Sequence, residues 1–114
     1  MKNNNIEEND IVKSDASVLY EVARTVKERV RDPEEGSYTN YLLSKGTDKI
    51  CKKVGEEAAE TIIAAKNADN AELANELADL FYHAVVLCES RGLDIDEVFK
   101  VLKERAESPR KREY

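Results

Sequence analysis

The sequence is short of the residues that build thiol-based sites, because its 114 residues include only two cysteines and one histidine. Cys51 and Cys88 are too few and too far apart for a disulfide framework or a zinc site. Both lie among apolar residues at helical spacing, which favours two small buried hydrophobic side chains. A nucleophilic cysteine also needs a partner base, and the only histidine is His83. We therefore set thiol catalysis aside.

Long apolar runs and a glycine-rich phosphate loop are missing as well. No stretch approaches the roughly 20 apolar residues that a membrane span needs. Residues 1–13 lack the basic start and the apolar run of a signal peptide, so we expect a cytoplasmic protein. The formal net charge is −6, and such an acidic chain is poorly suited to neutralising the phosphates of a nucleic acid.

The chain is rich in apolar residues at helical spacing. Hydrophobic residues make up 41% of it and recur with the 3.6-residue period of a helix, with no alternating strand pattern. We expect one small all-α domain over 14–107, between a mobile N-terminal tail at 1–13 and a charged C-terminal tail at 108–114. The helices are predicted over about 14–31, 47–66, 70–91 and 94–107, with a loop or a short helical turn at 37–46. Four modest helices bury limited apolar area, so we expect a second copy to complete the bundle.

The second predicted helix is unusually rich in acid. Glu56, Glu57 and Glu60 fall within five residues, and at about 100° per residue they lie off the apolar face. That predicted core face consists of Ile50, Val54, Ala58, Ile62 and Ala65. A solvated acidic face crossed by weak lysine pairs is one interpretation. Ile63 argues against it, because this apolar residue lies on the acidic side.

The third predicted helix favours a metal site instead. One narrow stripe carries its polar residues, which are Glu72, Glu76, Asp79 and His83. The second half of the helix is apolar around nearly its whole circumference, which is typical of a buried helix. Buried carboxylates must be paired or must bind a metal, and this helix offers them no lysine or arginine before Arg91. We expect His83 to be a supporting residue that hydrogen-bonds a carboxylate.

Antiparallel packing of these two helices would bring their acidic pairs together. The turn at 67–70 is short, so Glu57 and Glu60 would lie at about the height of Glu76 and Asp79. Four or five converging carboxylates favour Mg²⁺, or alternatively Mn²⁺. Mg²⁺ bound in this way usually completes its coordination with water and substrate phosphates. The other interpretation is a polar seam in which lysines pair with the carboxylates.

The acidic pairs Glu57-x-x-Glu60 and Glu76-x-x-Asp79 resemble the metal-binding signature of the all-α nucleoside triphosphate pyrophosphohydrolases with the MazG-like fold. The segments GSYTNYLLSKGTDKICKKVGEEAAETIIAAKN and ELADLFYHAVVL are similar, more particularly, to the phosphoribosyl-ATP pyrophosphohydrolase family of histidine biosynthesis. The resemblance covers about residues 17–105. It implies a homodimer, in a stand-alone form without the cyclohydrolase domain that some relatives carry.

The resemblance also implies a reaction, the second step of histidine biosynthesis. Water would attack phosphoribosyl-ATP between its α and β phosphates with the help of Mg²⁺, giving phosphoribosyl-AMP and pyrophosphate. The residues matched to the family's Mg²⁺ ligands are Glu57, Glu60, Glu76 and Asp79. The acids expected to be catalytic are Glu56, as a ligand or base, with Glu57 and Glu60. The lysines expected to bind substrate phosphates are Lys49, Lys52 and Lys53, with Lys45, Arg29 and Arg31 as further cations.

Two other functions fit the same acidic pairs. A related pyrophosphohydrolase that cleanses non-standard nucleotides would share them, although the GSYT and GTDKI segments favour phosphoribosyl-ATP. A non-enzymatic helical dimerisation module would instead pair its carboxylates with lysines across an interface. Such a module would not respond to Mg²⁺, so a metal titration separates it from both enzymes.

Overall fold

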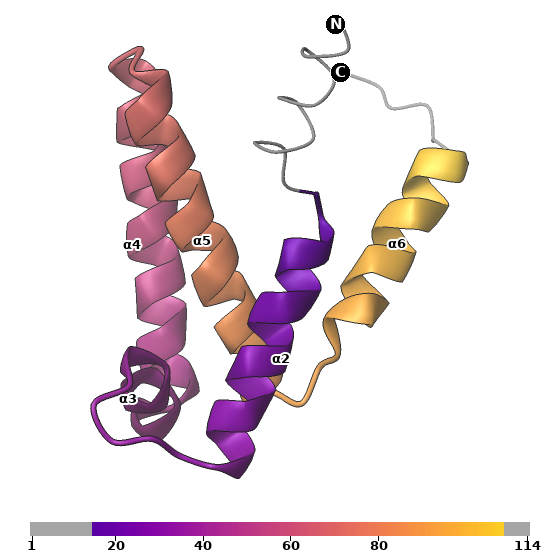
Figure 1. The fold of residues 1–114 in the computed structure, drawn as a ribbon. Helices are drawn as coiled ribbons and strands as arrows, with labels where there is room; N and C mark the ends of the chain where they lie inside the picture. Colours follow the sequence, from indigo (N-terminus) through magenta and orange to yellow (C-terminus); the bar gives the residue numbers. More distant parts are fainter. Residues whose placement is uncertain (1–14, 109–114) are drawn as a thin grey trace, which may run out of the picture.

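Residues 15–108 are described by a computed structural model, in which they form five helices and no strand (Figure 1). The helices are α2 (Ser17–Arg31), α3 (Tyr38–Lys45), α4 (Thr47–Lys66), α5 (Asn70–Ser90) and α6 (Ile95–Glu107). The all-α class predicted from the sequence is confirmed. The tail predicted at 1–13, and all but the first residue of the tail predicted at 108–114, lie outside the described residues. Within 15–108, no helix is both long enough and apolar enough to cross a membrane.

The segment at 37–46, predicted as a loop or a short helical turn, contains the full helix α3, which the prediction of four helices did not include. This helix begins after Ser37, whose hydroxyl oxygen accepts a hydrogen bond of 3.1 Å from the backbone N–H of Asn40, as a helix N-cap does. It ends at Gly46, whose φ of 94° is a conformation that favours glycine. Eight residues show too little of the 3.6-residue period to be recognised as a helix.

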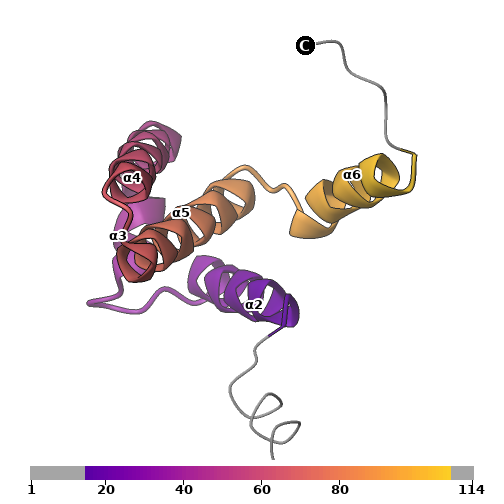
Figure 2. The ribbon, with the colours of Figure 1, turned by 90° about the horizontal axis from the view of Figure 1, so that it is seen from above.

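Helices α4 and α5 form a long antiparallel pair, as the sequence predicts (Figures 1 and 2). Asp69 ends the connection between them, and its carboxylate caps α5 by accepting a hydrogen bond from the backbone N–H of Glu72. The core lies toward the far end of this pair, where α2 and α3 pack against it. Its most enclosed side chains come one from each of these helices: Val26, Leu42, Ile50 and Val86. Burying each stabilises the fold by roughly 1.5–3 kcal/mol.

The core face predicted for α4 is correct only in part, since Ile50 is fully buried as expected but Ala65 is exposed. Ile62, expected in the core, is 63% exposed, whereas Glu57 is only 6% exposed. The buried side is the one that faces α5, and Ile50, Glu57 and Ala64 lie along it at intervals of seven residues, a spacing typical of a seam between two helices. Glu57 therefore lies inside the interface between α4 and α5.

The prediction that the second half of α5 is buried is correct only in part. Val85 and Val86 are buried, but Phe81 is 51% exposed. Helix α6 projects away from the α4–α5 pair (Figures 1 and 2) and is joined to α2 by Tyr20, which contacts Phe99 edge-on. Further apolar side chains are exposed on α6: Val98, Val101 and Leu102.

Candidate metal centre

Three carboxylates meet between α4 and α5. Glu57 of α4 faces Glu76 and Asp79 of α5, and one oxygen from each carboxylate lies within 4.8 Å of the others. Glu57 is buried, Glu76 is half-buried and Asp79 is exposed, so the group is open to solvent on one side. The antiparallel pairing thus brings together three of the four carboxylates that we expected to bind metal. We call Glu57, Glu76 and Asp79 the carboxylate trio.

Two oxygens of the trio lack a partner. Oε1 of Glu57 and Oε1 of Glu76 are buried, and neither forms a hydrogen bond within the described part of the chain. Leaving a buried polar atom unsatisfied costs about 1–3 kcal/mol, and more when the group is charged. A cation between the two helices would satisfy both oxygens, so the trio fits a metal ion.

Glu60, the fourth predicted ligand, is exposed and lies beside Glu76. Removal from water raises the pKa of Glu76 to about 7, and hydrogen bonding and charge repulsion from Glu60 and Glu72 add to the shift. Glu76 is therefore partly protonated near neutral pH when no cation is bound. A nearby positive charge would favour its ionised form.

The three lysines expected at substrate phosphates lie in different places. Nζ of Lys53 lies 3.4 Å from Glu56 and 3.7 Å from Glu57, which puts this ammonium at the edge of the trio. Nζ of Lys49 instead lies 5.9 Å from the centre of the Tyr41 ring. Lys52 is exposed, and on the helical wheel it lies about 140° from Glu57. Lys53 is the lysine that the fold places best for a phosphate bound at the trio.

His83 has different partners from those expected. The residue is only 5% exposed. Nδ1 lies 2.7 Å from the backbone oxygen of Asp79, and Nε2 lies 2.9 Å from the hydroxyl of Tyr38. A carbonyl oxygen only accepts, so Nδ1 carries the hydrogen, and in the neutral ring Nε2 accepts from Tyr38. The prediction of a carboxylate partner was wrong: His83 ties α3 to the backbone of α5.

The sequence reasoning gave Tyr38 no role. A lone histidine in an apolar helix must satisfy two ring nitrogens, and this requirement signals that a second partner exists. It does not say which residue provides that partner. Tyr38 lies 45 positions away along the chain, and only the folded α3 brings it to His83.

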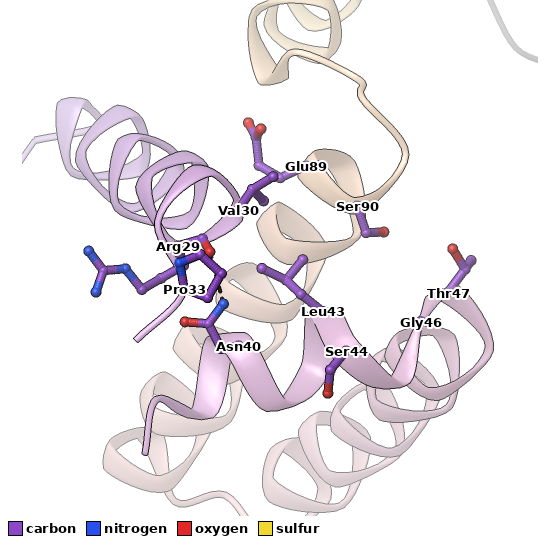
Figure 3. A pocket seen from close by; sticks show the side chains of 10 residues that line it. All are labelled: Arg29, Val30, Pro33, Asn40, Leu43, Ser44, Gly46, Thr47, Glu89 and Ser90. Atoms are coloured by element: carbon purple, nitrogen blue, oxygen red, sulfur yellow. Dashed lines mark hydrogen bonds between the residues drawn. The ribbon is translucent and has the colours of Figure 1, made fainter. Parts of the chain in front are cut away.

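A cavity of about 480 Å³ lies at the other end of the α4–α5 pair (Figure 3). It is lined by Arg29, Val30, Pro33, Asn40, Leu43, Ser44, Gly46, Thr47, Glu89 and Ser90. No member of the carboxylate trio borders it. The guanidinium of Arg29, one of the cations considered for phosphate binding, points away from the cavity (Figure 3), and its Nη1 lies 2.9 Å from Glu34. The cavity is therefore separate from the metal centre.

Comparison with known proteins identifies the family. The profile of the phosphoribosyl-ATP pyrophosphohydrolases matches residues 19–106. The chain belongs to this family. The match confirms the family that the acidic pairs and the GSYT segment indicated. The carboxylate trio, Lys53, Tyr38 and His83 all lie within the matched residues.

Named relatives include both short and long members of the phosphoribosyl-ATP pyrophosphohydrolase family. The phosphoribosyl-ATP pyrophosphatase of Streptococcus sanguinis is 58% identical over 77 residues, which cover 68% of this chain and 74% of the relative. That of Bacillus cereus is 47% identical over 94 residues, covering 82% and 85%. The histidine biosynthesis bifunctional protein HisIE of Oceanobacillus iheyensis is 48% identical over 99 residues, covering 84% of this chain but 46% of that protein. The chain thus spans less than half the length of this bifunctional relative.

Proposed function

We propose that the chain hydrolyses phosphoribosyl-ATP between its α and β phosphates in histidine biosynthesis, giving phosphoribosyl-AMP and pyrophosphate. The observation that carries this proposal is the carboxylate trio with its two unpartnered oxygens, found in a chain of this family. The names of the relatives support the choice of substrate. The cytoplasmic location stays a prediction from the sequence.

Mg²⁺ is the cation that we propose for the trio, with Mn²⁺ as an alternative, because all of the donors are oxygens. Glu57, Glu76 and Asp79 would hold it. Glu60 lies beside Glu76 but outside the trio, and we propose it as a further ligand. Bound there, the ion would supply positive charge for the substrate phosphates and acidify a water molecule.

The chain itself would supply phosphate binding and a base. Lys53 is paired with Glu56 in the absence of substrate, and a substrate phosphate would be a stronger partner for its ammonium. The carboxylate of Glu56 would then be free to take a proton from the attacking water. Glu57 and Glu60 would act on the reaction as metal ligands. Lys49 and Lys52 would contact parts of the substrate further from the trio.

Analysis of the products tests this proposal. Phosphoribosyl-ATP incubated with the purified chain and Mg²⁺ should give pyrophosphate and phosphoribosyl-AMP in equal amounts, measured by ion-exchange chromatography. Orthophosphate as the main product would place the cleavage between the β and γ phosphates and would contradict the proposal.

We also propose that the chain is a homodimer, because several large apolar side chains are exposed. They include Phe81 on α5 and Leu102 on α6, with Ile62 and Ile63 on α4. Burying a fully exposed side chain of this size gains roughly 1.5–3 kcal/mol. These residues are 51–63% exposed, so covering each gains about half of that. Light scattering at micromolar concentration should therefore return about twice the chain mass of 12.9 kDa.

Two variants of α6 sharpen the test of the dimer. Leu102→Gln places an amide among the exposed apolar side chains of α6 and should shift the population toward monomer. Glu104→Gln, a change at an exposed position of the same helix, should leave the mass unchanged. A wild-type mass near 12.9 kDa would rule the dimer out.

Magnesium binding should depend on pH through Glu76. Its pKa of about 7 without metal means that roughly half of these carboxyls are protonated at pH 7, and the proton must leave before the oxygen can bind Mg²⁺. The affinity should therefore rise between pH 6 and 8 and then level off. Calorimetry at pH 7 in buffers of different ionisation enthalpy should detect proton release. An affinity that does not change over this range would contradict the role of Glu76 as a ligand.

A further inference from the structure

We infer that Tyr38 binds the purine base of the substrate by stacking, and that His83 positions the ring of Tyr38 for this contact. The inference rests on the proposed function, since it concerns how the same substrate is held. Neither residue is a carboxylate or a phosphate-binding lysine, so neither is accounted for by the metal centre.

The exposed rings of α3 are the first observation. Tyr38 is 46% exposed and Tyr41, one helical turn later, is 43% exposed. Their centroids lie 6.1 Å apart and their planes differ by 23°, so the two rings are nearly parallel. Both border a groove of about 700 Å³, whose other wall is the loop at 33–37. Flat aromatic rings of this kind form stacking platforms for nucleic-acid bases.

The second observation is that Tyr38 is fixed in place although it is half-exposed. Its hydroxyl is bonded to Nε2 of His83, and His83 is bonded to the backbone of Asp79. The rings of Tyr38 and His83 also meet edge-on at 80°. Tyr82 stacks against Tyr38 with 26° between the planes, and Thr39 hydrogen-bonds the Tyr82 hydroxyl. A ring held in this way loses little freedom when a base binds, so more of the stacking energy appears as affinity.

The third observation is the distance to the reacting phosphates. His83 lies one helical turn from Asp79, a rise of about 6 Å, and Tyr38 contacts His83 directly. The charges of Lys53 and Glu57 also act on the hydroxyl of Tyr38, so a base on Tyr38 would lie on the same side of the fold as the carboxylate trio. Lys53, at the edge of the trio, would meet the phosphates that follow the ribose.

The charges around the platform also suit a nucleotide. Nζ of Lys45 lies 5.7 Å from the centre of the Tyr41 ring, and Nζ of Lys49 lies 5.9 Å from it. An ammonium over a ring is attracted to its π face and remains available to a phosphate or ribose oxygen. The surface of α3 and the start of α4 thus combines flat apolar rings with positive charge.

The binding affinities of two small ligands, measured by calorimetry, test whether Tyr38 contacts the base. AMP carries a base, a ribose and a phosphate, whereas ribose 5-phosphate lacks only the base. Tyr38→Leu should weaken AMP binding about 10-fold, the range found for loss of one aromatic stacking partner, and should leave ribose 5-phosphate unchanged. Equal effects on both ligands, no effect on either, or a wild type that binds AMP no more tightly than ribose 5-phosphate would each overturn the inference.

AMP binding to single and double variants tests whether His83 positions the ring of Tyr38. Tyr38→Phe keeps the ring but removes the hydroxyl, and His83→Phe removes the acceptor. Each should weaken AMP binding by about 3-fold, less than Tyr38→Leu, and the double variant should be no weaker than either single one because both remove the same bond. Additive losses would show that His83 does not act through Tyr38. Because AMP binding needs no turnover, a chain that shows these effects but fails to hydrolyse phosphoribosyl-ATP would refute the proposed function and leave the base site intact.

Discussion

Glu76→Gln should lose nearly all activity, by about 10²–10³-fold in kcat, the loss seen when one preorganised charge-stabilising group is removed. The amide has nearly the same shape as the carboxyl but cannot ionise, so the trio loses one of its three charged donors. The oxygen that lacks a partner, Oε1 of Glu76, would become part of a weak neutral ligand. Pyrophosphate release under saturating phosphoribosyl-ATP measures this loss.

The same substitution should not destabilise the metal-free fold. The pKa of Glu76 is about 7 in the folded chain, above its ordinary value of 4.5. The folded state therefore holds the proton more tightly than the unfolded state does, and the stability that this confers is complete below pH 4.5 and is lost as the pH rises through 7. Gln cannot ionise, so the variant should melt at least as high as wild type at pH 8, with its relative advantage smaller at pH 5.

The effect of Mg²⁺ on the melting temperature should also differ between wild type and Glu76→Gln. Mg²⁺ should raise the wild-type melting temperature, because a ligand that binds only the folded state stabilises it, and should have little effect on Glu76→Gln. Glu104→Gln is the control, since Glu104 is an exposed carboxylate on α6, outside the trio and not among the groups that shift the pKa of Glu76; it should keep activity and the response to Mg²⁺. If lysines held the carboxylates instead, Glu76→Gln would leave a lysine without its partner and would have a lower melting temperature than wild type. Mg²⁺ would then not change the melting temperature of wild type.

Phosphoribosyl-ATP should be hydrolysed with a kcat/KM at least about 10³-fold above that of ATP. ATP carries the same triphosphate but lacks the second phosphoribosyl group, and binding energy from such a remote group contributes to the transition state. Sites built to hydrogen-bond a polar group reject analogues that lack it by large factors. A panel of phosphoribosyl-ATP, ATP and common deoxynucleoside triphosphates, scored by pyrophosphate release, measures the ratio. Comparable rates on all of them would favour the nucleotide-cleansing alternative.

The sequence predicts the framework of the metal centre well, for physical reasons. Helices α4 and α5 are 20 and 21 residues long, so the 3.6-residue period has room to repeat. The connection between them is short, which forces the antiparallel pairing. Once the pairing is known, Glu57 must lie at about the height of Glu76 and Asp79 along the two helices.

The sequence predicts the orientation of α4 poorly. A helical wheel assigns the core face by hydrophobicity, and so it placed Ile62 inside and Glu57 outside. The fold does the reverse, because the side toward α5 carries Glu57 while Ile62 is exposed in the single chain. The hydrogen bond between Tyr38 and His83 could not be predicted either, because it depends on α3. This helix is too short for a helical wheel to detect.

Removal and return of magnesium tests the metal-dependent hydrolysis of phosphoribosyl-ATP most directly. Pyrophosphate release should stop when EDTA removes divalent cations, and added Mg²⁺ should restore the full rate in wild type but not in Glu76→Gln. Release that continues unchanged in EDTA would show that the carboxylate trio does not work through a metal ion, and would contradict the proposed function of this site.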